Sequence, residues 1–159
     1  EGSHYLDKAY EEAGAKLVDS PKELYANAEM VLKVCPPKSE EIDMMAEGCA
    51  VISFLETLRN PEIAKKLADK KITSFSMDTV PRISRAQAMD ALSSQASAAG
   101  YKAVLIAATK VRKFFPMLTT AAGTIPPAKV FVLGAGVAGL QAIATAKRLG
   151  ANVEAFDIR

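Results

Sequence analysis

Three glycines near the end of the chain have the spacing that most clearly indicates chemistry. They form the pattern Gly-x-Gly-x-x-Gly, written out as Gly134-Ala135-Gly136-Val137-Ala138-Gly139. An apolar run from Lys129 to Leu133 precedes them and a helical pattern up to Leu149 follows, which is the strand–turn–helix context that makes the motif specific. The first glycine would permit a tight turn, the second would let a diphosphate approach backbone N–H groups, and the third would let the helix pack closely on the strand. The pattern therefore predicts a dinucleotide-binding turn with the helix N-terminus facing the diphosphate.

An acidic residue stands where such a turn needs one to hold a ribose. A second expected strand, Asn152 to Phe156, ends at Asp157, eighteen residues after Gly139. A carboxylate there can accept from both hydroxyls of the adenosine ribose, whereas a 2′-phosphate would meet like-charge repulsion, so NAD is favoured over NADP. Arg159 is the counter-argument, because a guanidinium beside the ribose can hold a 2′-phosphate.

The glycine motif supplies a cofactor class and not a reaction. FAD enzymes and S-adenosylmethionine enzymes share parts of the same arrangement, and a tight strand-to-helix turn can exist without any ligand. The reaction has to be inferred from residues elsewhere in the chain.

Composition removes several classes of function. Half of the 159 residues are hydrophobic and the net charge is +2, so the chain can bury enough surface to fold. No apolar run approaches the length of a membrane-spanning helix, and no basic patch with stacked aromatics suggests nucleic acid. The two cysteines, Cys35 and Cys49, lack metal-ligand spacing, and no metal site is expected.

The elements that must position the glycine turn alternate between strands and helices. Apolar runs at residues 30–34, 50–54 and 72–77 predict parallel strands covered on both faces. Asn60 before Pro61 and Ser20 before Pro21 mark helix starts, and residues 5–13 predict a further helix. The fold class is therefore α/β, with two Rossmann-like, doubly wound parallel-sheet domains that both look incomplete.

The middle of the chain has a different character. Ser84 and Gln87 form a capping-box pattern before a helix that is rich in Ala and Ser up to Ala99, a composition typical of tight helix packing or of close approach by a flat ligand. Gly100 is expected to end or kink this helix, with an amphipathic segment continuing to Phe115. Prolines and glycines then suggest an interdomain crossing. We predict a first domain at residues 1–115, the crossing at 116–128 and a truncated NAD-binding β-α-β unit at 129–159.

Two long strings carry a specific resemblance. PRISRAQAMDALSSQ, from Pro81 to Gln95, and TAAGTIPPA, from Thr120 to Ala128, together with the glycine motif, resemble the NAD(H)-binding component of proton-translocating nicotinamide nucleotide transhydrogenase. The resemblance runs along the whole chain and is densest from Pro81 onward.

The resemblance implies a reaction and a set of residues for it. It implies direct hydride transfer from NADH bound here to NADP on a partner component, coupled through a membrane component to proton translocation. In that family an Arg-Gln-Asp loop positions the nicotinamide, and the matching residues are Arg82, Gln87 and Asp90, with Ser93 matching a serine near the carboxamide. Gln87, Asp90 and Ser93 are three apart, so one helix face could present all three. Without the resemblance, capping and a solvated helix surface would explain Gln87 and Asp90.

Two other functions remain open. Alanine dehydrogenase shares this architecture, but it uses a lysine and a histidine on its keto acid. Its Lys-Val-Lys-Glu-Pro string is here Lys-Val-Cys-Pro-Pro from Lys33, and its Tyr-Leu-His string ends here at Glu56, while the single histidine, His4, lies far from both. A non-catalytic NAD-binding module would share the glycine motif but would leave Arg82, Gln87 and Asp90 without a joint role.

The resemblance also implies partners and a location. We expect NADP-binding and membrane-spanning components as partners, a homodimer, no nucleic acid and no direct insertion into the membrane. The location implied is the cytoplasmic face of a bacterial inner membrane, or the mitochondrial matrix side in a eukaryote. Because the glycine motif begins at Gly134, we expect this stretch to complete neither domain, to bind NAD weakly by itself and to be inactive alone.

Overall fold

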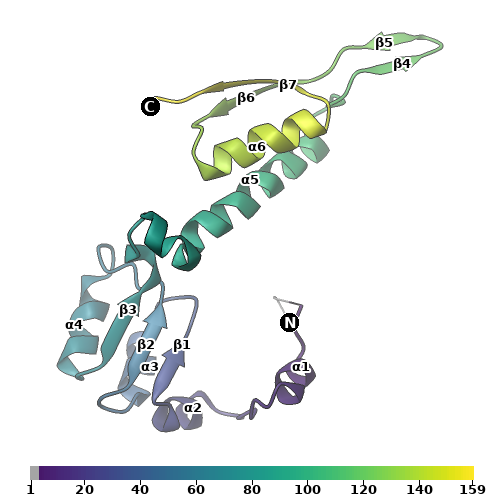
Figure 1. The fold of residues 1–159 in the computed structure, drawn as a ribbon. Coiled ribbons are helices and arrows are strands. Elements are labelled where there is room, and N and C mark those ends of the chain that lie inside the picture. The colour runs from purple at the N-terminus through teal and green to yellow at the C-terminus, as the bar shows by residue number, and fades with distance from the viewer. Residues whose placement is uncertain (1–3) are drawn as a thin grey trace. The chain divides into compact units, whose positions relative to one another are not determined.

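The computed structural model describes residues 4–159, and these divide into two compact units (Figure 1). The first unit ends at Pro81 and the second begins at Arg82. Both carry parallel β-sheet, as the α/β fold class requires. The division into domains with a crossing at residues 116–128 stays a prediction.

The first unit contains a three-stranded parallel sheet. Its strands are β1 (Met30–Leu32), β2 (Ala50–Ser53) and β3 (Thr73–Ser76), and they lie side by side in chain order (Figure 1). Helices α3 (Ser39–Met44) and α4 (Pro61–Asp69) form the crossovers between them. The three strands expected from the apolar runs are thereby confirmed, each one to two residues shorter than expected.

One face of this sheet is buried and the other is open. Val31 and Val51 pair across β1 and β2 and pack in one core with Ile42 of α3 and Leu67 of α4. On the opposite face, Leu32 of β1 is 73% exposed, and Phe75 of β3, on the far side of β2, is 56% exposed. The expectation that helices cover both faces is therefore wrong for the residues described, because α3 and α4 contribute to one and the same core.

The helices that begin the first unit follow their expected start signals in part. Helix α1 (Asp7–Glu12) is shorter than the expected segment 5–13 and buries no residue. Helix α2 (Pro21–Asn27) begins after Ser20, whose hydroxyl accepts a 3.1 Å hydrogen bond from the backbone N–H of Glu23. Helix α4 begins at Pro61 as expected, but the Asn60 side chain makes no capping hydrogen bond, so proline alone marks that start.

The second unit is built around a long helix and a β-α-β motif. Helix α5 (Ala91–Lys110) follows a 3₁₀ helix, η2 (Ser84–Met89), and packs against α6 (Val137–Arg148). Strands β6 (Lys129–Leu133) and β7 (Asn152–Phe156) pair in parallel on either side of α6 in the sequence. Buried Val104, Phe115, Ala128, Ala146 and Ala151 form the core of this unit.

Two expectations for the middle of the chain are wrong. The capping box at Ser84 does not form: Ser84 is the first residue of η2, and no side chain caps that short helix. The α-helix starts only at Ala91, where the Asp90 carboxylate accepts from the backbone N–H of Ser93 at 2.9 Å. Gly100 neither ends nor kinks the helix, which runs through it to Lys110.

Helix α3 and the hairpin of β4 and β5 have no counterpart in the sequence-based expectations. The short helix α3 occupies residues that follow a proline pair and carry little apolar periodicity. Strands β4 (Leu118–Thr120) and β5 (Gly123–Ile125) form an antiparallel hairpin inside the segment that we expected to be an interdomain crossing. Gly123 has φ +134°, a conformation that glycine adopts without strain, and the hydroxyls of Thr119 and Thr124 face each other at 3.4 Å. Within residues 4–159, no helix is long and apolar enough to cross a membrane.

Candidate dinucleotide-binding site

The glycine turn, residues 134–139, lies between β6 and α6 as its sequence context predicts. Gly134 has φ +95°, in the left-handed region where a side chain would be strained, and its N–H donates to the Phe156 carbonyl at 2.7 Å. This hydrogen bond extends the β6–β7 ladder into the turn. The chain can then reverse directly from the strand into the helix.

Gly139 allows α6 to approach the preceding turn closely. A Cβ atom built on Gly139 would lie 1.8 Å from the Gly134 carbonyl oxygen and 3.6 Å from a methyl of Val132. At 1.8 Å from that oxygen there is room for the glycine hydrogen but not for a carbon atom. The third glycine therefore performs the packing role that the sequence pattern assigned to it.

The first turn of α6 offers donors toward an anion. Gly136 precedes the helix in an extended conformation, and having no side chain it supplies no cap. The N–H groups of Val137, Ala138 and Gly139 stand in the first turn, where an α-helix provides no intrahelical acceptors. Such donors, together with the partial positive charge of the helix end, suit a diphosphate.

Asp157 lies directly beside this turn. Its carboxylate accepts from the backbone N–H of Ala135 at 2.6 Å and from that of Arg159 at 2.8 Å. These two hydrogen bonds, with a smaller contribution from the Arg159 guanidinium, hold the pKa of Asp157 below its ordinary value of 3.8. The side chain is therefore ionised at neutral pH, and each oxygen keeps a lone pair for a further donor such as a ribose hydroxyl.

Arg159 is much more loosely held than its acidic neighbour. Its Nε lies 4.0 Å from the Asp157 carboxylate, and its side chain is 86% exposed. A pair of this kind contributes little to stability. The role of this guanidinium in the choice between a ribose hydroxyl and a 2′-phosphate stays a prediction.

The predicted nicotinamide-positioning residues lie around the start of α5. The Asp90 carboxylate accepts from the Ser93 hydroxyl at 2.6 Å, and the pKa of Asp90 is lowered by Ser93 first and then by the charge of Arg82. Gln87 lies in η2 and is exposed. The expectation that one helix carries Gln87, Asp90 and Ser93 is wrong, because the 3₁₀ helix ends at Met89 and Asp90 caps the next helix.

A close contact that local sequence patterns did not assign to particular residues joins α5 to α6. Gly100, in the middle of α5, lies against the Ala138 carbonyl at the start of α6. The run of Ala and Ser was the available signal, and tight helix packing was one of its two interpretations. In the structure Gly100 lies inside the helix without a positive φ, so close packing and not a turn explains the glycine.

The two positions where alanine dehydrogenase is expected to have its lysine and histidine hold other residues here, Cys35 and Glu56. Cys35 is exposed, and Glu56 has φ +48° with its carboxylate 3.6 Å from Arg59. Lys33 is ion-paired with Glu41, which also accepts from the Tyr25 hydroxyl at 3.0 Å. Neither position 35 nor position 56 holds a lysine or a histidine, the groups that the dehydrogenase uses.

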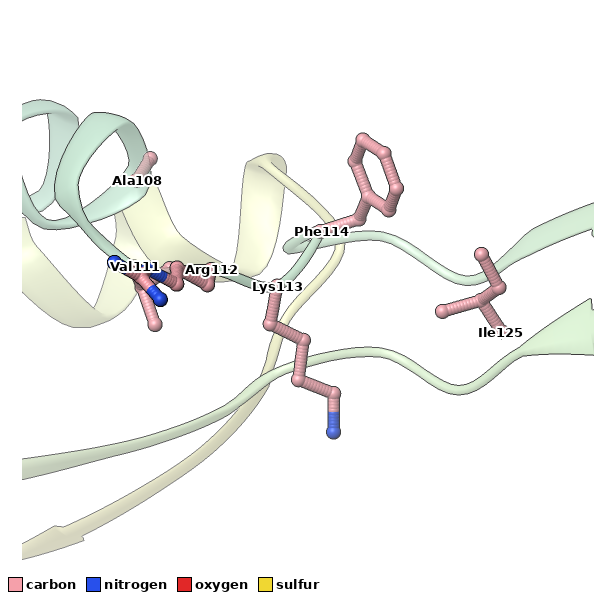
Figure 2. Close-up of a pocket in the computed structure, with 6 residues that line it drawn as sticks. All are labelled: Ala108, Val111, Arg112, Lys113, Phe114 and Ile125. Atoms are coloured by element: carbon pink, nitrogen blue, oxygen red, sulfur yellow. The ribbon is translucent and has the colours of Figure 1, made fainter.

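One cavity lies away from all predicted site residues. It has a volume of about 460 Å³ at the end of α5, and Figure 2 shows the six side chains that line it: Ala108, Val111, Arg112, Lys113, Phe114 and Ile125. In this view the Phe114 ring and the Lys113 side chain point in opposite directions from the segment that follows α5 (Figure 2). Because it shares no residue with the glycine turn, we do not assign the dinucleotide to it.

Comparison with known proteins places this arrangement in a family. NAD(P) transhydrogenase subunit alpha of Haemophilus influenzae is 54% identical over 98% of this chain, which covers 30% of that protein. A transhydrogenase structure from Sinorhizobium meliloti superposes with a TM-score of 0.94 at 49% identity, over 99% of this chain and 47% of that one. Alanine dehydrogenase of Bacillus subtilis is 33% identical, over 99% of this chain and 41% of that protein.

The chain thus spans less than half the length of these relatives. Residues 1–99 match the N-terminal domain of alanine dehydrogenase/PNT and residues 103–159 match its C-terminal domain. The chain therefore belongs to the alanine dehydrogenase/PNT family, with high identity to transhydrogenase alpha subunits and a more distant relation to alanine dehydrogenases.

Proposed function

We propose that this chain is the NAD(H)-binding part of a proton-translocating transhydrogenase. Hydride passes directly from NADH on this component to NADP⁺ on a partner component, and the transfer is coupled to proton translocation through a membrane component. The observation that carries the proposal is the ionised Asp157 held at the glycine turn, next to a helix start without a side-chain cap. The higher identity to transhydrogenase alpha subunits than to alanine dehydrogenases supports the choice of reaction.

The residues present fit NAD(H) at this turn. Gly136 supplies no side chain that would fill the cradle, and Gly139 admits no Cβ. Backbone N–H groups from Gly136 to Gly139 hold the diphosphate, and Asp157 accepts from the ribose hydroxyls, with Ala135 fixing its carboxylate. A 2′-phosphate would meet the negative charge of Asp157, so NAD(H) binds here and NADP(H) binds on the partner component.

The nicotinamide end is oriented by the residues around the start of α5. Arg82 and Asp90 provide opposite charges in proximity, and Ser93 holds the Asp90 carboxylate. Gln87, exposed on η2, is free to bind the carboxamide or its ribose. Bound NADH supplies the hydride, so these residues orient the ring and no general acid or base is required.

Partners and location follow from the same proposal. The transhydrogenase relatives carry names that designate a subunit, as in subunit alpha of Haemophilus influenzae and of Cereibacter sphaeroides. We infer that NADP-binding and membrane-spanning components hold this chain at the cytoplasmic face of a bacterial membrane, or at the matrix side in a eukaryote, and that two copies form a dimer. We further infer that residues 116–128 connect the first domain to the NAD-binding one.

Alanine oxidation is the competing reaction, and the site chemistry disfavours it. That reaction needs a base and a cation to bind and activate the keto acid. At the corresponding positions this chain has Cys35, which is exposed, and Glu56, which is near Arg59. Neither can provide the cation that a carboxylate substrate requires.

The test follows hydride transfer from NADH to an NADP analogue, using the full-length protein mixed with the NADP-binding partner. We expect Gln87→Ala to lower the rate at least about tenfold while NADH still binds, because misplacing the ring costs rate more than affinity. Gln95→Ala is the matched control, since Gln95 is an exposed glutamine on α5 outside the predicted site. An unchanged rate in Gln87→Ala would show that the segment around the start of α5 does not position the nicotinamide. Reduction of NAD that depends on alanine would favour the dehydrogenase reaction.

A further inference from the structure

Helices α5 and α6 approach each other most closely at a glycine. A Cβ atom built on Gly100 of α5 would lie 2.1 Å from the carbonyl oxygen of Ala138, 2.9 Å from its carbonyl carbon and 3.1 Å from its Cα. All three atoms belong to the backbone, so rotation of a side chain cannot relieve the overlap. Any residue other than glycine at position 100 must move the first turn of α6 relative to α5.

Backbone conformation does not explain this glycine. Gly100 is not among the residues with positive φ, it is buried, and it lies inside a 20-residue helix. In such a position alanine would favour the helix through backbone entropy alone. The residue is therefore explained by the close approach to Ala138, at the expense of helix propensity.

A polar contact one turn earlier on α5 joins the same two helices. The Ser97 hydroxyl lies 3.5 Å from the Oε1 atom of Gln141, which is one turn after Ala138 on α6. The amide of Gln141 donates to the Thr145 hydroxyl at 3.2 Å, and that hydroxyl donates to the Gln141 carbonyl at 2.7 Å. The Gln141 side chain is thus fixed from both sides, so the position of α6 along α5 is determined at two adjacent points.

These contacts connect the two ends of the proposed dinucleotide site. Asp90 caps α5, and Gly100 lies ten residues further along the same helix, about 15 Å away at 1.5 Å per residue. At that point it contacts Ala138, whose N–H is one of the proposed diphosphate donors. A single helix therefore sets the distance between the nicotinamide-positioning residues and the glycine turn.

We infer that Gly100 is a positioning residue for the dinucleotide: it sets the place of the diphosphate-binding turn relative to α5 and is reinforced by Ser97 and Gln141. Widening the 2.1 Å separation between the added Cβ and the Ala138 carbonyl oxygen to an ordinary contact requires a shift of more than 1 Å in Gly100→Ala. That shift moves the N–H donors of Ala138 and its neighbours away from the diphosphate. The inference rests on the proposed function, because it assumes that a diphosphate binds at this turn.

The experiment compares ADP with adenosine as ligands of the full-length protein. The adenosine dissociation constant divided by the ADP dissociation constant isolates the contribution of the diphosphate, since both ligands carry the adenosine that Asp157 is proposed to hold. We expect Gly100→Ala to reduce this ratio at least about tenfold, with adenosine affinity within about twofold of wild type. Ala103→Gly, at an exposed position of the same helix, is the control for helix propensity and should leave the ratio unchanged.

If Gly100→Ala only destabilises the protein, the affinities for ADP and for adenosine fall together and their ratio is unchanged. That result would overturn the inference. Ser97→Ala covers the case in which Gly100→Ala does not fold, because it only removes a hydroxyl; we expect about a two- to fivefold smaller ratio. A wild-type ratio in Ser97→Ala would then overturn the inference. If the wild-type protein binds ADP no better than adenosine, the proposed dinucleotide turn itself is wrong, and the inference falls with it.

Discussion

Replacing Asp157 by asparagine tests cofactor choice at the glycine turn. The carboxylate accepts from Ala135 and Arg159 through hydrogen bonds of 2.6 and 2.8 Å, and two ribose hydroxyls would add to these. Asparagine has the same shape but only one acceptor oxygen, and its NH₂ group would face a backbone donor. Both the turn and the ribose contact are weakened in Asp157→Asn.

The expected size of the effect follows from the number of charge-assisted bonds. Losing the charge and one acceptor should weaken NADH binding by about 10- to 100-fold, the range for one hydrogen bond to an ionised group. NADPH should not lose affinity, because the repulsion between its 2′-phosphate and the carboxylate disappears. The NADH preference over NADPH should therefore fall at least about tenfold.

The assay is titration calorimetry of the full-length protein with NADH and with NADPH. Glu154→Gln is a matched control, because Glu154 is an exposed carboxylate on β7 and its replacement removes the same charge without touching the turn. If Asp157→Asn binds NADH within about twofold of wild type, or loses NADPH affinity in the same proportion, the ribose role assigned to Asp157 is wrong.

Three further outcomes are expected. Gly139→Ala should abolish NADH binding and lower the free energy of unfolding, measured by urea titration, by about 1–3 kcal/mol, because the new Cβ would overlap the Gly134 carbonyl oxygen. NADH affinity within about twofold of wild type would contradict this packing role. Glu41→Gln should cost about 1–3 kcal/mol of unfolding free energy without changing NADH affinity, because it leaves the half-buried Lys33 without its ion partner; unchanged stability would contradict a structural role for the pair. The lowered pKa of Asp157 means that its hydrogen bonds stabilise the turn above pH 3.8 and that this contribution disappears as the pH falls through the folded-state pKa. An NMR titration of the Asp157 carboxyl carbon should therefore have its midpoint below pH 3.8. A midpoint at or above that pH would contradict the hydrogen bonding described.

Sequence reasoning succeeded where one local pattern determines the structure. Strands β6 and β7 have the bounds expected for them, Lys129–Leu133 and Asn152–Phe156. A short apolar run, glycines at fixed spacing and a helical period leave few alternatives for such a segment. The close contact of Gly139 with Gly134 was likewise foreseeable, because the third glycine of this motif has a known packing role.

Sequence reasoning failed where two residues compete for one local role. Ser84 and Gln87 have the spacing of a capping box, but Asp90 caps the helix instead, six residues later. Both Ser84 and Asp90 are acceptable caps by residue type, and only the packing of the following helix decides between them. As a result the predicted positioning residues lie on two different helical segments rather than along one face.

Tertiary contacts explain the remaining differences. Gly100 has the residue type that ends helices, yet its role is set by Ala138, which is 38 positions away and invisible to local patterns. The hairpin of β4 and β5 lies in a segment whose prolines and glycines equally suit an irregular loop. The uncovered sheet face with Leu32 and Phe75 could not be distinguished from a covered one by hydrophobicity alone.

The most direct test of the proposed function uses NADH that carries deuterium at the transferring position of the nicotinamide. The full-length protein is mixed with the NADP-binding partner and an NADP analogue, and the reduced product is examined by mass spectrometry. Direct transfer predicts that the deuterium appears in the reduced analogue and that none is lost to water. Deuterium released into the solvent, or NADH oxidation that proceeds without the analogue, would contradict the proposal.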